Sequence, residues 1–169
     1  MKVTFLGTGT SVGVPTVGCD CLTCVSTDPR DNRLRCSLLL ETDGHKILVD
    51  ASTDFRQQAL RTGLKQIDAI LFTHAHADHC FGLDDARPIM FRNGAIPCFG
   101  SEITWEGLRR VYWYAFESSP SGVPRIEPRY LNGPFSLFSM QVEPLTVIHG
   151  RLPVTAYRIG SFAYVTDCN

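Results

Sequence analysis

The stretch FTHAHADHC at residues 72–80 places three of the chain's five histidines and one aspartate within six positions. These residues are His74, His76, Asp78 and His79. Clustered imidazoles are costly, because protonated rings repel one another and a neutral ring needs partners for both nitrogens. A divalent metal removes this cost, since neutral imidazole and carboxylate are good ligands for it. The motif follows the apolar run AILF, so we expect a buried strand that opens into a metal-binding loop.

If the chain stays extended after this strand, His74, His76 and Asp78 point to one side and a turn must present His79. One ion cannot easily take all four ligands from so short a segment, whereas two ions roughly 3.5–4 Å apart can share them. The alternative is a polar surface loop in which histidines cluster by chance. We favour the metal, because an H-x-H-x-D-H pattern after a strand has known ligand chemistry.

Length and composition fit one globular domain, which we assign to residues 1–169. The net charge is −1 and no dense Lys/Arg run occurs, which disfavours nucleic acid as a partner but allows a small phosphate-containing substrate. No signal peptide or membrane-spanning segment is predicted, because the apolar runs are too short. The expected location is therefore the cytoplasm.

Short β-branched and apolar runs predict many strands. They lie at residues 2–8, 36–42, 46–52, 69–74 and 96–101, then in PFSLFSM, VEPLTVI and a hairpin at 155–167 that turns at Gly160-Ser161. Strands with helices inserted between some of them predict an α+β or layered sandwich fold.

Three helices are predicted, at residues 52–63, 82–91 and 101–116. The first takes Ser52 or Thr53 as its N-cap, ends at Gly63 and carries Phe55, Ala59 and Leu60 on one face. Pro88 is expected to kink or end the second. Residues 117–128 are predicted to form an exposed loop.

A second cluster, GCDCLTC at residues 18–24, contains Cys19, Cys21 and Cys24. The C-x-C-x-x-C spacing allows three thiolates to hold a structural zinc ion with one further ligand. The alternative is three reduced cysteines in a Gly-rich loop. Seven cysteines is an odd number, which in a reducing compartment favours a metal over disulfides. The cysteines at positions 80, 98 and 168 are predicted to be small buried residues.

Two other features favour structural roles over ligand binding. Gly7, Gly9 and Gly13 lack the dinucleotide-binding spacing, so we predict a strand-to-loop bend beside the metal site. The aromatic residues between Trp105 and Phe116 are predicted to pack in a core rather than to stack a base.

The histidine motif resembles the metal-binding signature of the metallo-β-lactamase superfamily, and further motifs match in order along the chain. These motifs are FLGTGTSVGVPTVGCDCLTC, VDASTDFRQQ, THAHADH, His149-Gly150 and YVTDCN. They are most similar to the PhnP-like phosphodiesterase branch, and more distantly to the tRNA 3′-processing ribonucleases. The resemblance implies an α+β fold of the αββα type, a four-layer sandwich whose second half is incomplete in this chain.

The resemblance also implies a ligand set. His74, His76 and His149 would hold one divalent ion, Asp78 and His79 would hold a second, and Asp167 would bridge the two. The expected ions are Zn²⁺ or Mn²⁺, with Asp78 and His79 as catalytic residues and Asp50 supporting the ligands. In the resembling branch a C-terminal histidine completes the cysteine site. No histidine follows His149 here, so Cys36 is a candidate substitute.

The implied activity is metal-dependent hydrolysis of a small phosphate ester, cyclic esters included, by water activated between two ions. Three alternatives stay open: a thioester or lactone hydrolase, an RNA 3′-processing enzyme that the net charge disfavours, and a non-catalytic zinc-binding module. The expected partner is the phosphate-ester substrate, and a homodimer also stays open.

Superfamily members continue beyond the point that corresponds to Asn169, with further strands, helices and a histidine for the second ion. We therefore expect these 169 residues to be a fragment or a shortened version. The second ion would keep only Asp78, His79 and the shared Asp167, and should bind more weakly than the first. The strand before Asp167 would form an apolar sheet edge.

Overall fold

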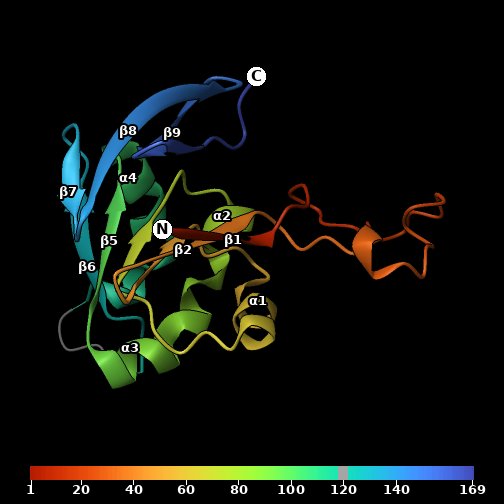
Figure 1. The fold of residues 1–169 in the computed structure, drawn as a ribbon, viewed down its shortest axis with the longest axis horizontal. Helices are drawn as coiled ribbons and strands as arrows, with labels where there is room; N and C mark the ends of the chain where they lie inside the picture. The colour runs from red at the N-terminus through yellow and green to blue at the C-terminus, as the bar shows by residue number, and fades with distance from the viewer. Residues whose placement is uncertain (118–121) are drawn as a thin grey trace.

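Two β-sheets organise the computed structural model, which describes residues 1–117 and 122–169 (Figure 1). The first sheet has the strand order β1-β2-β3-β4-β5-β6. Its strands are β1 (Lys2–Gly7), β2 (Ser37–Thr42), β3 (His45–Val49), β4 (Ala69–Leu71), β5 (Ile96–Gly100) and β6 (Ile126–Tyr130). The pairs from β1 to β3 are antiparallel and those from β3 to β6 are parallel. The carboxyl ends of β3, β4 and β5 therefore lie at one edge of the sheet.

The second sheet is antiparallel, with the strand order β10-β9-β8-β7. Its strands are β7 (Phe135–Leu137), β8 (Met140–His149), β9 (Leu152–Ile159) and β10 (Phe162–Tyr164). The hairpin predicted around Gly160-Ser161 is confirmed as the connection between β9 and β10. Strand β10 is an edge strand, as predicted.

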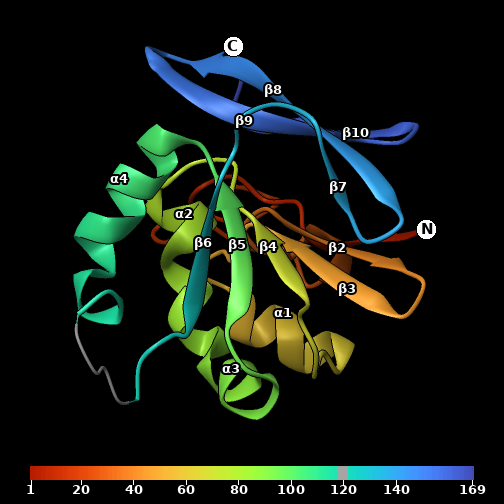
Figure 2. The same cartoon turned by 90° about the vertical axis from the view of Figure 1, so that its left-hand side faces the viewer.

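The two faces of the first sheet bury different side chains, because successive residues of a strand point to opposite faces. Leu38 and Leu40 of β2 pack with Tyr157 and its neighbours in the second sheet. Leu39, between them, packs with Phe55 and the residues of the helices. The second sheet therefore covers one face of the first sheet and the helices cover the other (Figure 2).

The helices are α1 (Phe55–Thr62), α2 (Ala77–Cys80), α3 (Arg87–Asn93) and α4 (Glu102–Val111), with the 3₁₀ segments η1 (Pro29–Asp31), η2 (Phe81–Ala86) and η3 (Trp113–Ala115). Within the described residues no helix covers the outer face of the second sheet, so three layers of the predicted αββα sandwich are present. None of the described helices is long and apolar enough to cross a membrane.

The predicted start of α1 is wrong. The helix begins at Phe55 after Asp54, and the Asp54 carboxylate makes no capping bond because it accepts hydrogen bonds from the backbone N–H and guanidinium of Arg35 instead. Its predicted apolar face is also partly wrong, since Leu60 is exposed whereas Gln58 is buried and donates to the Arg35 carbonyl. This polar contact to the backbone just before β2 therefore turns the Gln58 face of α1 inward.

Pro88 has a different role from the predicted one. It lies in the first turn of α3 rather than ending a helix, because the N–H that proline lacks has no intrahelical partner there. The helix predicted at 101–116 ends at Val111 and continues only as η3. Of the loop predicted at 117–128, residues 118–121 lie outside the described part of the chain, and residues 126–128 belong to β6.

Two further sequence predictions concern side-chain burial. Cys80 and Cys98 are buried as predicted, but Cys168 is exposed. The aromatic group divides, because Trp105 and Tyr112 are core residues whereas Trp113 is exposed. The sequence pattern correctly predicted that Trp105 and Tyr112 are core residues, but it did not predict that Trp113 is exposed.

Helix α4 packs unusually close to the histidine loop. A Cβ atom added to Gly107 would lie 2.5 Å from the Cβ atom of Ala75, which sits between His74 and His76. Real Cβ atoms do not approach this closely, so the missing side chain at position 107 is what permits the contact. This close contact explains why a glycine, which has low helix propensity, occurs in the middle of α4.

We predict that Gly107→Ala destabilises the fold, although alanine normally stabilises a helix by about 0.5–1 kcal/mol relative to glycine. Overpacking against Ala75 should lower the free energy of unfolding by about 1–3 kcal/mol in urea titrations. Ala75→Gly in the same chain should recover most of the loss, which a double-mutant cycle measures. A stabilised Gly107→Ala variant would show that α4 and the loop are not in contact.

Candidate metal centre

The predicted site residues gather where both sheets end. Asp50 follows β3, and the histidine motif follows the neighbouring parallel strand β4. His149 is the last residue of β8 and Asp167 follows β10, so these two come from the second sheet. Loops after adjacent parallel strands emerge at the same edge, which explains how Asp50 meets a motif more than twenty residues later.

The sequence allowed the motif to be extended from His74 to Asp78, but the backbone is not extended over this whole stretch. It is extended at His76, with φ −68° and ψ 150°, and then enters the helical turn α2 at Ala77. Asp78 and His79 are therefore presented by a helical turn, and the expectation that Asp78 shares an extended segment with His74 and His76 is wrong. The change of direction lets one short segment supply ligands to two positions.

Asp50 is fully buried and accepts three hydrogen bonds. Its Oδ1 accepts from the backbone N–H of Thr73 at 2.8 Å. Its Oδ2 accepts from the Thr73 hydroxyl at 2.8 Å and contacts Nδ1 of His79 at 2.8 Å. Because an ionised carboxylate can only accept, His79 donates through Nδ1 and its Nε2 is directed away from Asp50.

The same chain of hydrogen bonds assigns the tautomer of His74. Thr73 has one hydroxyl proton and donates it to Asp50, so its oxygen must accept the 2.9 Å hydrogen bond from Nδ1 of His74. The Nε2 atom of His74 is then unprotonated, and it is buried without a hydrogen-bond partner in the described structure. Burial, reinforced by the charge of His79, lowers the pKa of His74 to about 4, so the ring is neutral at physiological pH.

His79 has the opposite electrostatic environment. Burial alone lowers its pKa, but the hydrogen bond and charge of Asp50, together with Asp78 and Asp167, outweigh burial and raise the pKa to about 9. Burial raises the pKa of Asp167, but the charges of the neighbouring histidines and a hydrogen bond from Thr166 together outweigh burial and lower the pKa. Three carboxylates thus surround one buried imidazole, and this position favours a cation.

Two groups of potential ligand atoms share Asp167. One group is His74, His76 and Asp167, the other is Asp78, His79 and Asp167, and within each group the ligand atoms lie within 4.8 Å of one another. Oδ2 of Asp167 lies 3.7 Å from Nε2 of His74 and 3.4 Å from Nε2 of His79. His149 lies beside the first group, with its Nε2 3.8 Å from Oδ2 of Asp167. The structure therefore brings together all six residues predicted as ligands.

These residues fit divalent cations. The Nε2 atom of the neutral His74 ring has an available lone pair. Leaving a buried nitrogen without a partner is costly, and a bound cation would supply that partner. Imidazole and carboxylate suit zinc and manganese among other metals. Asp50 and Asp167 also have φ values of 60° and 47°, and strained non-glycine residues of this kind cluster at functional sites.

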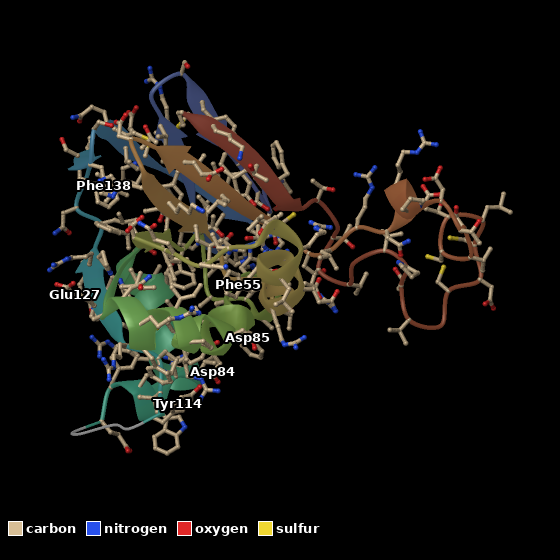
Figure 3. All side chains as sticks on the ribbon, turned by 60° about the horizontal axis from the view of Figure 1, so that its bottom comes forward. Phe55, Asp84, Asp85, Tyr114, Glu127 and Phe138 are labelled. Carbon is tan, nitrogen blue, oxygen red and sulfur yellow. The ribbon has the colours of Figure 1, made fainter. Side chains whose placement is uncertain are left out.

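The predicted cysteine site lies elsewhere. The segment between β1 and β2 extends away from both sheets, and Figure 3 shows sulfur atoms close together on it. Cys19, Cys21 and Cys24 have their sulfur atoms within 4.8 Å of one another. Hydrogen bonding by the Cys24 backbone, and by the thiols of Cys19 and Cys24, lowers the pKa of Cys21 to about 7, which favours the thiolate that binds metal.

Cys36 does not join this cluster. It lies directly before β2, where its thiol contacts the Gly9 carbonyl at 3.1 Å and lines a cavity with Asp78 and His79. The sequence suggested Cys36 as a fourth cysteine-site ligand, and its position excludes that role in this conformation.

Two cavities open onto the histidine cluster. The larger, about 620 Å³, is lined by residues 8–11, Asp78, His79, His149 and Asp167. The predicted strand-to-loop bend is thus confirmed beside the site, and a Cβ atom on Gly7 would lie 2.0 Å from the Arg35 carbonyl oxygen. We call the smaller one, about 220 Å³, the α4 cavity, because it lies between His74–His76 and helix α4.

Sequence reasoning missed two residues of this region. Thr73 links Asp50 to His74, and its position directly before the first histidine was the available signal. Arg110 lines the α4 cavity, and no motif marks it, since it is distant in sequence from every ligand.

Comparison with known proteins identifies the family. A family model described as "Beta-lactamase superfamily domain" matches residues 45–169. A solved structure described as a new diphosphatase from the PhnP family is 44% identical, with a TM-score of 0.88 over 96% of this chain and 63% of that chain.

Two curated relatives extend the comparison. An octanoyltransferase from Porphyromonas gingivalis is 43% identical over 171 residues, which cover 99% of this chain but 35% of that protein. A ribonuclease Z from Clostridium acetobutylicum is 38% identical over 92 residues, which cover 53% of this chain and 29% of that protein. The chain therefore spans less than two thirds of each of these relatives. The matched model, the two sheets and the order of the motifs together show that the chain belongs to the beta-lactamase superfamily and has the metallo-β-lactamase fold.

Proposed function

We propose that the chain is the core of a metal-dependent hydrolase that acts on a small phosphate ester. The observation that carries this proposal is the pair of ligand groups that share Asp167. His74, His76 and His149 would hold one divalent ion, Asp78 and His79 would hold a second, and Asp167 would bridge them. Zinc and manganese are the proposed ions.

Divalent ions at such a site supply charge neutralisation for phosphate oxygens and a hydroxide nucleophile near neutral pH. The chain's own contribution is preorganisation. Asp50 and Thr73 fix the rings of His79 and His74 so that each Nε2 faces Asp167. The larger cavity, which contacts four of the proposed ligands, would hold the ester.

Attack at phosphorus is supported by the identity of 44% to a protein described as a diphosphatase. Phosphodiesters and diphosphates share this reaction centre, and a small ester is favoured over RNA by the net charge of −1. The ribonuclease Z relative keeps RNA processing as a second candidate, because its match includes half of this chain. Thioester or lactone hydrolysis would use the same ligands, and turnover of a thioester and of a lactone by the same metal-loaded protein tests it.

The octanoyltransferase relative does not favour acyl transfer in this chain. Only 35% of that protein aligns with these residues, so the part of it that is not matched is large enough to carry the octanoyltransferase activity. A non-catalytic zinc-binding module is the remaining alternative. It would bind zinc at the cysteine cluster alone and would turn over neither phosphate esters nor thioesters.

We predict that His76→Ala lowers turnover of bis(p-nitrophenyl) phosphate by at least about 100-fold, the upper end of the loss seen when a residue that merely supports a ligand is removed. His76 is exposed, so circular dichroism should report an intact fold. Metal content is measured on the same samples with and without added manganese. His45→Ala is the matched control, because His45 stacks on Phe138 with ring centroids 3.7 Å apart, away from the cluster. Equal turnover by His76→Ala and wild type would refute the ligand assignment.

We predict that Asp50→Asn weakens metal binding by about 10- to 100-fold. The amide oxygen can still accept from the Thr73 N–H, but the NH₂ group then faces the Thr73 hydroxyl and Nδ1 of His79. His79 would have to accept at Nδ1 and carry its proton on Nε2, the nitrogen proposed to bind metal. Calorimetric titration with Zn²⁺ measures the affinity, and the exposed Asp85→Asn is the control. A folded Asp50→Asn protein with wild-type affinity would contradict this role of Asp50.

We propose a structural zinc ion at Cys19, Cys21 and Cys24, and predict that Cys21→Ser lowers zinc stoichiometry and the melting temperature. Occupancy at the histidine cluster should fall less, because the cysteines lie on the β1–β2 segment that extends away from both sheets, whereas the histidine cluster lies where the sheets end. Cys98→Ala removes a buried thiol outside both sites and should leave zinc stoichiometry unchanged. If Cys21→Ser retains the full zinc content, the cysteine cluster is not a zinc site.

A further inference from the structure

The α4 cavity lies on the His74–His76 side of the cluster, whereas the larger cavity lies on the Asp78–His79 side. A substrate hydrolysed at the cluster has two substituents, one on each side of the bond that breaks. Each of the two cavities can hold one of these substituents. At about 220 Å³ the α4 cavity is smaller than a site for a drug-sized ligand, so it suits one substituent rather than a whole substrate.

One face of helix α4 forms the wall of this cavity. Ile103, Gly107 and Arg110 are spaced four and three residues apart, so they lie on the same side of the helix. Trp105 and Leu108 occupy the other side and are buried in the core. Since Gly107 lets the helix approach Ala75 closely, Arg110 is held one helical turn away from the histidine loop.

Arg110 is the only lysine or arginine among the described residues that line either cavity. The larger cavity contains the carboxylates of Asp78 and Asp167 and no permanent cation from the described chain. A phosphate group that does not contact the proposed metal ions therefore has one cationic partner available. A guanidinium binds phosphate through two parallel hydrogen bonds, which makes arginine well suited to this role.

Arg110 is also available for a ligand. Within residues 1–117 and 122–169 its side chain makes no hydrogen bond, ion pair or cation–π contact. The neighbouring Arg109 is engaged, since it donates to the Tyr130 hydroxyl at 3.3 Å and its guanidinium lies 4.5 Å from the Phe116 ring centroid. The two adjacent arginines thus differ in environment, and only one of them lines the cavity.

Glu106 lines the same cavity one turn before Arg110. A carboxylate opposes a purely anionic occupant but accepts hydrogen bonds from hydroxyl groups. An arginine and a glutamate together therefore match a substituent that has both a phosphate and hydroxyls, as a sugar phosphate does.

We propose that Arg110 is a specificity-determining residue that binds the second phosphate of a diphosphate diester whose substituent also carries hydroxyl groups. This inference rests on the proposed function and deepens it. In the reaction the oxygen of one water molecule forms a bond to one phosphorus and the bond from that phosphorus to the bridging oxygen breaks. The bridging oxygen leaves on the second phosphate, so two phosphate monoesters form and protons are released to solvent near neutral pH.

The test compares two substrates across variants of the metal-loaded protein. ADP-ribose has two phosphates and sugar hydroxyls, whereas bis(p-nitrophenyl) phosphate has one phosphate and no hydroxyl. For Arg110→Ala, the kcat/KM for ADP-ribose divided by that for bis(p-nitrophenyl) phosphate should fall about 10- to 100-fold, the effect of losing a hydrogen bond to a charged group. Arg110→Lys should lie between wild type and Arg110→Ala, because it keeps the charge and loses the two-pronged geometry.

Arg109→Ala is the matched control, and its substrate ratio should equal that of the wild type. A second readout is calorimetric binding of ADP, which should weaken about tenfold or more in Arg110→Ala and not in Arg109→Ala. Both arginines are exposed, so neither variant should unfold, and thermal melting checks this.

The outcomes separate this inference from the proposed function. If wild type hydrolyses phosphate esters but the substrate ratio and ADP binding are unchanged in Arg110→Ala, the role of Arg110 is refuted and the hydrolase stands. If loaded wild type hydrolyses neither substrate, the proposed function fails, and ADP binding alone decides whether Arg110 recognises a diphosphate.

Discussion

The buried carboxylate of Asp50 accepts hydrogen bonds from the backbone and hydroxyl of Thr73 and from the ring of His79. An unpaired buried charge would be strongly destabilising, so these three donors are what permit a fully buried aspartate. In return the carboxylate determines which nitrogen of His79 is directed toward Asp167 and, through the Thr73 hydroxyl, which nitrogen of His74 is unprotonated. The chemistry of the centre depends on this one acceptor.

The positions of Asp50 and Thr73 follow from the first sheet, in which β3 and β4 are parallel neighbours with Val49 opposite Leu71. The second sheet is joined to the same loop by two hydrogen bonds, from the Thr155 N–H to the Thr73 carbonyl and from the Tyr157 hydroxyl to the Phe72 carbonyl. These contacts fix how the ends of β8 and β10 approach the cluster. His149 and Asp167 therefore reach the histidines because the two sheets pack face to face.

Helix α4 gives the site a second side. Its contact with Ala75 depends on the absence of a side chain at Gly107, and the same helical face carries Arg110 and Glu106 into a cavity beside the histidines. The proposed metal ligands and the groups proposed to select a substrate thus come from different elements. This division fits a fold that supports several chemistries, because the metal ligands can stay constant while a neighbouring helix changes.

The sequence by itself determined the histidine motif, the cysteine cluster, the β9–β10 hairpin and the order of the ligands, because each depends on residues close together in the chain or on a resemblance in motif order. It did not determine the helical turn that presents Asp78 and His79, the inward face of α1 or the place of Pro88 in the first turn of α3, since local propensity is overridden by tertiary contacts. Only the tertiary structure decided that Thr73 sets the tautomer of His74 and that Arg110 borders the site. Both facts depend on contacts between segments that are distant in sequence, Asp50 with Thr73 and α4 with the histidine loop, and the position of Thr73 beside His74 does not reveal its bond to Asp50.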